Sequence, residues 1–87
     1  MKYISLDLRN KMTRAKIHEV LKVMLEFPEY YGNNYNALYD ELTSVQEKVE
    51  IEVIINEADL KKWETLRRVL ADAANDNKHI VLRGKVL

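Results

Sequence analysis

Residues Val49–Ile55 form a run in which polar and apolar side chains first alternate and then become continuously apolar. Alternation with a period of two is the pattern of a β-strand, and a fully apolar end favours a strand with neighbours on both sides. The run therefore predicts a central strand. Lys2–Asp7 alternates in the same way, and His79–Leu82 is a shorter apolar run, so these two segments are its expected partners.

Between the first two predicted strands, apolar residues recur at the spacing of an α-helix. Thr13 is a good N-cap for a helix that should stop before Phe27-Pro28, because the residue before proline is disfavoured in the helical region. Asn34 can cap a short second helix. Its expected core face is Leu38, Leu42 and Val45, and its expected solvent face is Asn36, Asp40 and Thr43.

A third helical region is expected from Asn56 to Asn75-Asp76-Asn77, either as one helix or as two with a break near Glu64-Thr65. The order strand, helix, helix, strand, helix, strand implies parallel pairing through right-handed crossovers. The predicted fold is therefore α/β, a small three-stranded parallel sheet packed with three to four helices. A chain of 87 residues has room for one core, so a single domain over 1–87 is expected.

The absence of cysteine excludes a disulfide framework and a thiolate metal site. The N-terminus has no long apolar stretch like that of a signal peptide, and no segment approaches the length of a membrane span. If the chain is complete, we expect it to stay in the cytoplasm.

Charge is unevenly distributed, although the 14 basic and 14 acidic side chains cancel. Residues 1–25 hold six basic and two acidic side chains. Residues 26–52 hold one basic and seven acidic side chains, and residues 53–87 hold seven basic and five acidic ones. An acidic middle can present a negative face that attracts a cationic partner and repels nucleic acid. The alternative is a solvated surface with no partner.

The sequence contains no recognisable catalytic or cofactor-binding motif. His18 and His79 are far apart and have no partner at metal-ligand spacing, and no serine lies near a histidine in a nucleophile motif. Gly32 and Gly84 stand alone, so no phosphate-binding glycine loop is present. We therefore expect no enzyme activity, no metal and no cofactor. Basic residues in the first helix could bind phosphate, but without interleaved aromatic residues a solvated helix face is favoured; these residues are Lys11, Arg14, Lys16 and Lys22.

Four of the five tyrosines lie within ten residues, at 30, 31, 35 and 39. Tyr31 and Tyr35 could belong to the core. Tyr39 and Asp40 lie on or beside the helix face opposite Leu38, near Tyr30 in the loop. Tyrosine supplies rigid contact area and is enriched in binding hot spots, so these residues indicate a protein–protein interface.

The segment FPEYYGNNYNALYDEL at residues 27–42 resembles the motif by which the barstar family is identified. The resemblance extends over the whole chain, with a deletion of several residues around Asn56–Thr65, where the family usually has a separate helix. It implies an intracellular inhibitor that blocks the active-site cleft of a small basic extracellular, barnase-like ribonuclease in a 1:1 complex, without binding nucleic acid or membrane.

The resemblance also implies roles for individual residues. Asp40 matches the carboxylate that mimics a substrate phosphate, Tyr30 matches the ring that packs on the catalytic histidine of the nuclease, and Asp72 matches a supporting acidic contact. Gly32 and Asn34 match residues that shape the loop. The full set of expected partner-binding residues is Tyr30, Tyr31, Gly32, Asn34, Tyr35, Asn36, Tyr39, Asp40, Thr43, Ser44 and Asp72.

Three positions depart from the best-known member of the family. Asn36 stands where that member has an interfacial aspartate, and Tyr39 and Val45 each stand where it has a tryptophan. These departures keep an alternative open, in which the same scaffold binds a different basic toxin domain or another protein.

Overall fold

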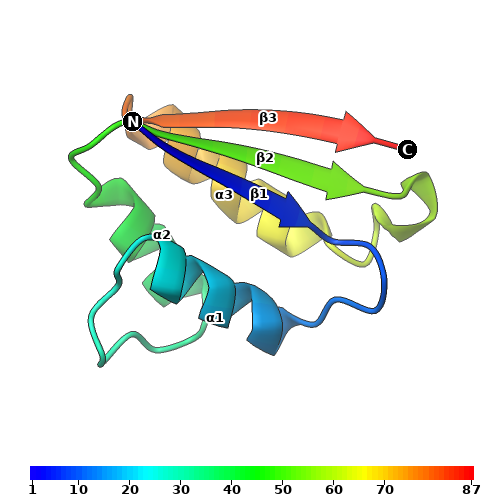
Figure 1. Ribbon diagram of the computed structural model, residues 1–87, viewed down its shortest axis with the longest axis horizontal. Coiled ribbons are helices and arrows are strands. Elements are labelled where there is room, and N and C mark those ends of the chain that lie inside the picture. The colour runs from blue at the N-terminus through cyan, green and yellow to red at the C-terminus, as the bar shows by residue number, and fades with distance from the viewer.

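The computed structural model describes residues 1–87 as a three-stranded sheet with three α-helices and one short 3₁₀ turn (Figure 1). In chain order the elements are β1 (Lys2–Asp7), α1 (Arg14–Met24), α2 (Tyr35–Thr43), β2 (Val49–Ile55), η1 (Glu57–Asp59), α3 (Glu64–Asp76) and β3 (Ile80–Val86).

The sheet has the strand order β1-β2-β3, and both pairings are parallel. This confirms the α/β prediction and the central position of β2. The helices lie on one side of the sheet (Figure 1), and alternate residues of β2 are buried against them. On the open side Glu50 pairs with Arg83, at 2.8 Å between carboxylate and guanidinium, and Glu52 accepts a hydrogen bond from Tyr3. Ile54 lies on this side half-buried, so the continuous apolar end of β2 reflects its central position rather than burial on both faces.

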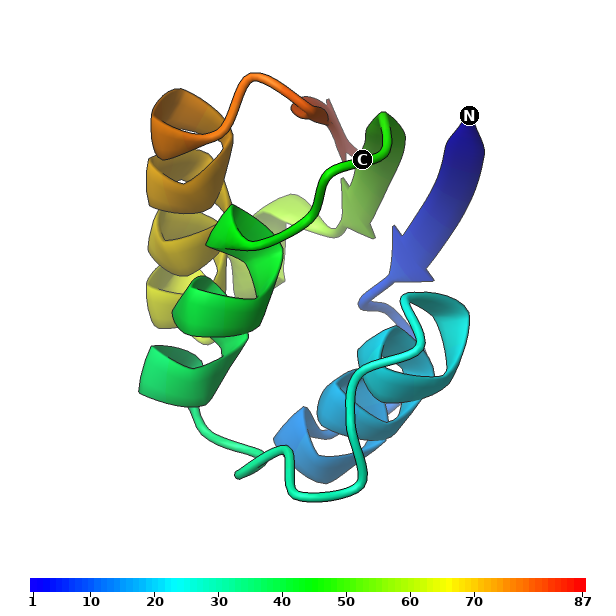
Figure 2. The same ribbon diagram turned by 90° about the vertical axis from the view of Figure 1, so that its left-hand side faces the viewer.

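The core lies between the sheet and the helices and contains 18 buried hydrophobic residues. Leu38 and Leu42 are fully buried, as their spacing predicted, and Val45 packs against the core from just beyond the end of α2. Figure 2 shows α2 running beside α3 and joined to α1 by a long loop. None of the helices is long and apolar enough to cross a bilayer.

The third helical region divides into η1 and α3, with the α-helix beginning at Glu64, so of the two alternatives left open by the sequence the structure has the one with a break. Trp63 is buried immediately before α3. The last strand, β3, continues to Val86, beyond the predicted end at Leu82. Arg83, Gly84 and Lys85 break the apolar pattern, but their backbone pairs with β2 along its full length.

Candidate functional site

Asn34 sets both the start of α2 and the shape of the loop before it. Its Oδ1 accepts a hydrogen bond from the Ala37 amide at 2.8 Å, and its Nδ2 donates to the Gly32 carbonyl at 3.3 Å. A Cβ at Gly32 would lie 3.0 Å from that Nδ2, so the close approach of loop and cap favours glycine. These two residues therefore shape the loop, and the exposed residues around them take their positions from this cap.

The loop tyrosines separate into an exposed ring and buried or half-buried ones. Tyr30 is 85% exposed, the most exposed large hydrophobic side chain in the protein. Tyr31 is 5% exposed, and its hydroxyl lies 2.5 Å from His18 Nδ1. The expectation that Tyr31 contacts a partner is therefore wrong: it packs in the core and supports the loop from below. Tyr35 is half-buried against the core.

The outer side of α2 carries Asn36 and Asp40, both exposed as predicted. The neighbouring hydroxyls are bonded within the helix: Thr43 Oγ donates to the Tyr39 carbonyl at 2.8 Å, and Ser44 Oγ donates to the Asp40 carbonyl at 2.8 Å. These bonds satisfy carbonyl groups in the last turn of α2. The Asp40 carboxylate makes no ion pair within the chain, so it is free to meet a cation from outside.

Helix α3 brings two more carboxylates to the same side. The Tyr39 hydroxyl donates a hydrogen bond to Asp76 in the last turn of α3. That hydrogen bond is the main cause that raises the pKa of Tyr39, with burial and the charges of Asp76, Asp72 and Asp40 adding to it. The charges of the predicted residues Asp40 and Asp72 therefore both act on the Tyr39 hydroxyl.

Asp76 was not among the residues expected at the site. It lies four residues after Asp72, one helical turn along the same face of α3, and that spacing was the signal that could have found it. We call a set of polar and aromatic residues of the loop, α2 and α3, all exposed except the half-buried Tyr39, the docking surface. It consists of Tyr30, Asn36, Tyr39, Asp40, Asp72 and Asp76.

Asn77 fixes the position of α2 relative to α3 and β3. Its Nδ2 donates to the carbonyls of Leu42, at 3.0 Å, and Val45, at 2.9 Å, and its Oδ1 accepts from the His79 amide at 3.0 Å. The side chain is 8% exposed, so these bonds are largely shielded from water. Asn77, the first residue after α3, therefore fixes the C-terminal end of α2, the helix that carries Asp40. No three potential metal-ligating side chains lie together anywhere in the chain.

Comparison with known proteins identifies the family. The family model for Barstar (barnase inhibitor) matches residues 1–85. The chain belongs to the barstar family. The match includes every helix and every strand except the last residue of β3.

The chain is also similar to a curated protein, the Bacillus subtilis (strain 168) protein named "Putative ribonuclease inhibitor YrdF". It is 44% identical over 43 residues, which cover 49% of this chain and 47% of the relative. The matched segment thus spans about half the length of that protein.

Proposed function

We propose that this barstar-family chain inhibits a small basic extracellular ribonuclease of the barnase type, forming a 1:1 complex in which the docking surface covers the active-site cleft. The family assignment and the name of the Bacillus subtilis relative support ribonuclease inhibition. The observation that carries the proposal is the exposed carboxylate of Asp40, which has no ion pair and lies on α2 next to Tyr39, whose hydroxyl bonds to Asp76 of α3.

An RNA-cleaving site must hold phosphate, so it presents cations that a carboxylate can satisfy in place of the substrate. Asp40 supplies that carboxylate from a rigid helix and has no internal cation to give up on binding. Tyr30, in the loop before α2, supplies flat, rigid contact area. Asp76 acts indirectly, because its bond to the Tyr39 hydroxyl fixes that ring between the acidic groups.

Inhibition in this proposal is occlusion, so the chain needs no catalytic group and does not act on RNA itself. The acidic middle of the sequence also steers association with a basic enzyme and disfavours nucleic acid. Action in the cytoplasm, on nuclease that has not yet left the cell, belongs to the same proposal.

A second candidate partner is a different basic toxin domain. Asn36 is exposed beside Asp40 but uncharged, which removes one charge from the docking surface. A partner with one cation fewer at that point would fit better than one that requires two adjacent carboxylates. This alternative keeps the docking surface and changes only the protein that it binds.

The test is inhibition by the parent chain and by Asp40→Ala and Glu41→Ala, each titrated against the nuclease encoded in the same genome. Loss of one partner of a desolvated interfacial charge pair costs about 2–5 kcal/mol of binding. We expect Asp40→Ala to lose that much and to unfold in urea like the parent. Glu41 is the matched control, because it lies about 100° further around α2 and is half-buried.

Equal inhibition by the parent and Asp40→Ala, or a greater loss in Glu41→Ala, would show that another face docks. Inhibition of an unrelated basic nuclease but not the co-encoded one would favour the second candidate. RNA cleavage by the purified chain would contradict the proposal as a whole.

A further inference from the structure

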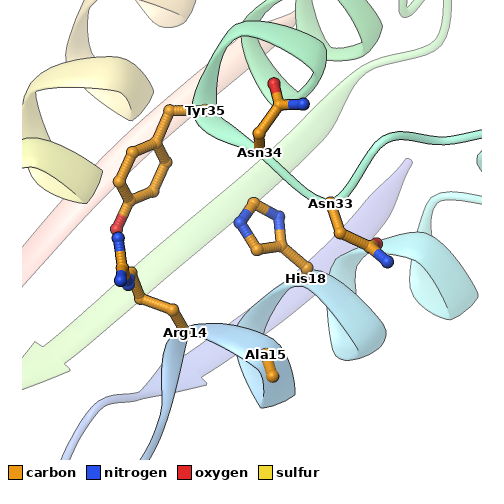
Figure 3. A pocket seen from close by; sticks show the side chains of 6 residues that line it. All are labelled: Arg14, Ala15, His18, Asn33, Asn34 and Tyr35. Atoms are coloured by element: carbon orange, nitrogen blue, oxygen red, sulfur yellow. The ribbon is translucent and has the colours of Figure 1, made fainter.

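A pocket of about 390 Å³ lies between the first turn of α1 and the start of α2. The docking surface defined above does not include its side chains. Figure 3 shows the His18 ring in the middle of the pocket, with Arg14 and Tyr35 on one side and Asn33 on the other. The complete lining is Arg14, Ala15, His18, Asn33, Asn34 and Tyr35.

The pocket is cationic and contains no acid. Arg14 and His18 are four residues apart, so both project from the same side of α1. Arg14 takes part in none of the five ion pairs of the chain, and no carboxylate lines the pocket. An unpaired guanidinium in a concave polar site attracts anions, because nothing in the chain neutralises its charge.

His18 is held in a fixed orientation. It is 5% exposed and lies between two aromatic rings, with the centroids of Tyr31 and Tyr35 each 5.7 Å from its own. Its Nδ1 lies 2.5 Å from the Tyr31 hydroxyl, which can donate a hydrogen bond to that nitrogen or accept one from it. In the tautomer in which the hydroxyl donates, the neutral ring has its proton on Nε2, and the imidazolium has a proton on Nε2 as well. His18 Nε2 can thus donate a hydrogen bond to an anion.

The loop adds one further side-chain amide to the lining of the pocket. Asn34 uses both ends of its amide, on Ala37 and Gly32, but the Asn33 amide makes no such bond. The sequence disfavoured phosphate binding by α1 because that helix lacks interleaved aromatic residues. The fold removes that objection, since Tyr35 from α2 lies against the same pocket (Figure 3).

We propose that this pocket binds a phosphate group, with Arg14 supplying the charge and His18 Nε2–H and the Asn33 amide supplying hydrogen bonds. The donors come from α1 and from the loop, so they surround the site from different sides. A tetrahedral oxyanion offers acceptors in all of these directions. The phosphate belongs either to inorganic phosphate or to a mononucleotide whose base packs on Tyr35.

A bound phosphate also changes the proton affinity of His18. Burial, and secondarily the charge of Arg14, lower the pKa of His18 below its ordinary value. The rings of Tyr31 and Tyr35 also face it, and Glu41 acts only on Tyr31. A dianion in the pocket favours the imidazolium and raises the pKa of His18. Binding of the phosphate dianion should therefore be accompanied by proton uptake at His18.

The test is an NMR titration of the full chain with sodium phosphate at constant ionic strength, following the imidazole resonances. The chain has only two histidines, and His79 lies outside the pocket, so it serves as an internal control. We expect a saturable shift and an upward move of the titration midpoint for His18 but not for His79. Arg14→Gln should bind about tenfold more weakly, as expected for one lost charge-assisted bond.

Lys16→Gln is the matched control, because Lys16 is exposed on α1 and does not line the pocket. This variant should bind phosphate within about twofold of the parent affinity, as expected when a surface charge has no role in the site. Tighter binding of adenosine monophosphate than of phosphate would identify a nucleotide as the source, and equal binding would identify phosphate itself. A shift that does not saturate, equal shifts of both histidines, or equal losses in both variants would overturn the proposal.

Discussion

Replacing Asn77 with alanine should destabilise the protein more than any other substitution of a polar side chain, because this side chain joins α2 to the end of α3 and the start of β3. The substitution removes the hydrogen bonds to the Leu42 and Val45 carbonyls and from the His79 amide, and with them the contact between Asn77 Oδ1 and His79 Nδ1. At about 1 kcal/mol for each of the three bonds to backbone groups, the expected loss is about 3 kcal/mol of unfolding free energy. For a domain of this size that is a large fraction of the total stability.

The side-chain bonds, rather than the backbone conformation, should account for this loss. Asn77 has φ −133° and ψ 110°, an extended conformation that alanine adopts without strain. Asn77→Asp separates the contributions, because a carboxylate keeps the acceptor for the His79 amide but places negative charge against two carbonyl oxygens. We expect Asn77→Asp to be less stable than Asn77→Ala at neutral pH. Asn75→Ala, at an exposed position two residues earlier, is the control and should change stability by less than about 0.5 kcal/mol.

Urea unfolding followed by fluorescence measures these differences directly, because Trp63 is the only tryptophan and is 2% exposed. The midpoint should fall in the order Asn75→Ala, Asn77→Ala, Asn77→Asp, with similar slopes. A loss below about 1 kcal/mol for Asn77→Ala would mean that water replaces the side chain at both carbonyls. Equal losses for alanine and aspartate would refute the role assigned to the two donor bonds.

Three further predictions concern the core, the pH dependence and the rate of association. Leu38→Ala should lower the unfolding free energy by about 2–4 kcal/mol in urea, because Leu38 is fully buried; an unchanged midpoint would contradict its place in the core. The pKa of His18 is lowered mainly by burial, so below pH 6.5 the unfolded chain binds more protons than the folded chain. Thermal stability should therefore fall as pH drops below that value, and His18→Gln should reduce this dependence of the melting temperature on pH. Association with the nuclease should slow as salt rises, since ~0.1 M salt screens charges beyond about 10 Å; equal stopped-flow rates at low and high salt would exclude steering by the docking surface.

Local signals in the sequence predicted the elements well and predicted their ends less well. Thr13 and Asn34 cap their helices by accepting amide hydrogen bonds from Lys16 and Ala37, as their residue types suggest. These signals succeed because a cap depends on contacts within a few residues. The end of β3 was missed because Arg83–Lys85 has no apolar pattern, and its strand conformation depends on pairing with distant β2.

Contacts between distant elements account for what the sequence did not predict at the site. Whether Tyr31 or Tyr30 faces the core depends on how the loop crosses α1, and the decisive contact is the bond to His18, thirteen residues away. The Tyr39–Asp76 bond joins residues 37 apart on two helices. A one-dimensional pattern shows which residues share a helix face but not which faces meet. The spacing from Asp72 could have placed Asp76 on the same face of α3, but its bond to Tyr39 follows only from the packing of α2 against α3.

Because of this packing, the residues that hold the docking surface in place differ from the residues that a partner can contact. Leu38 and Leu42 on the inner face of α2, together with Asn77, fix the helix without contributing an exposed atom of the surface. Asn36 and Asp40 on the outer face make no ion pair within the chain. Substitutions on the outer face can therefore change the partner at little expense to folding, because the inner contacts are untouched. On this basis Asn36→Asp should alter the affinity for a basic nuclease and leave the urea midpoint unchanged, whereas a loss of stability would mean that the two faces are coupled.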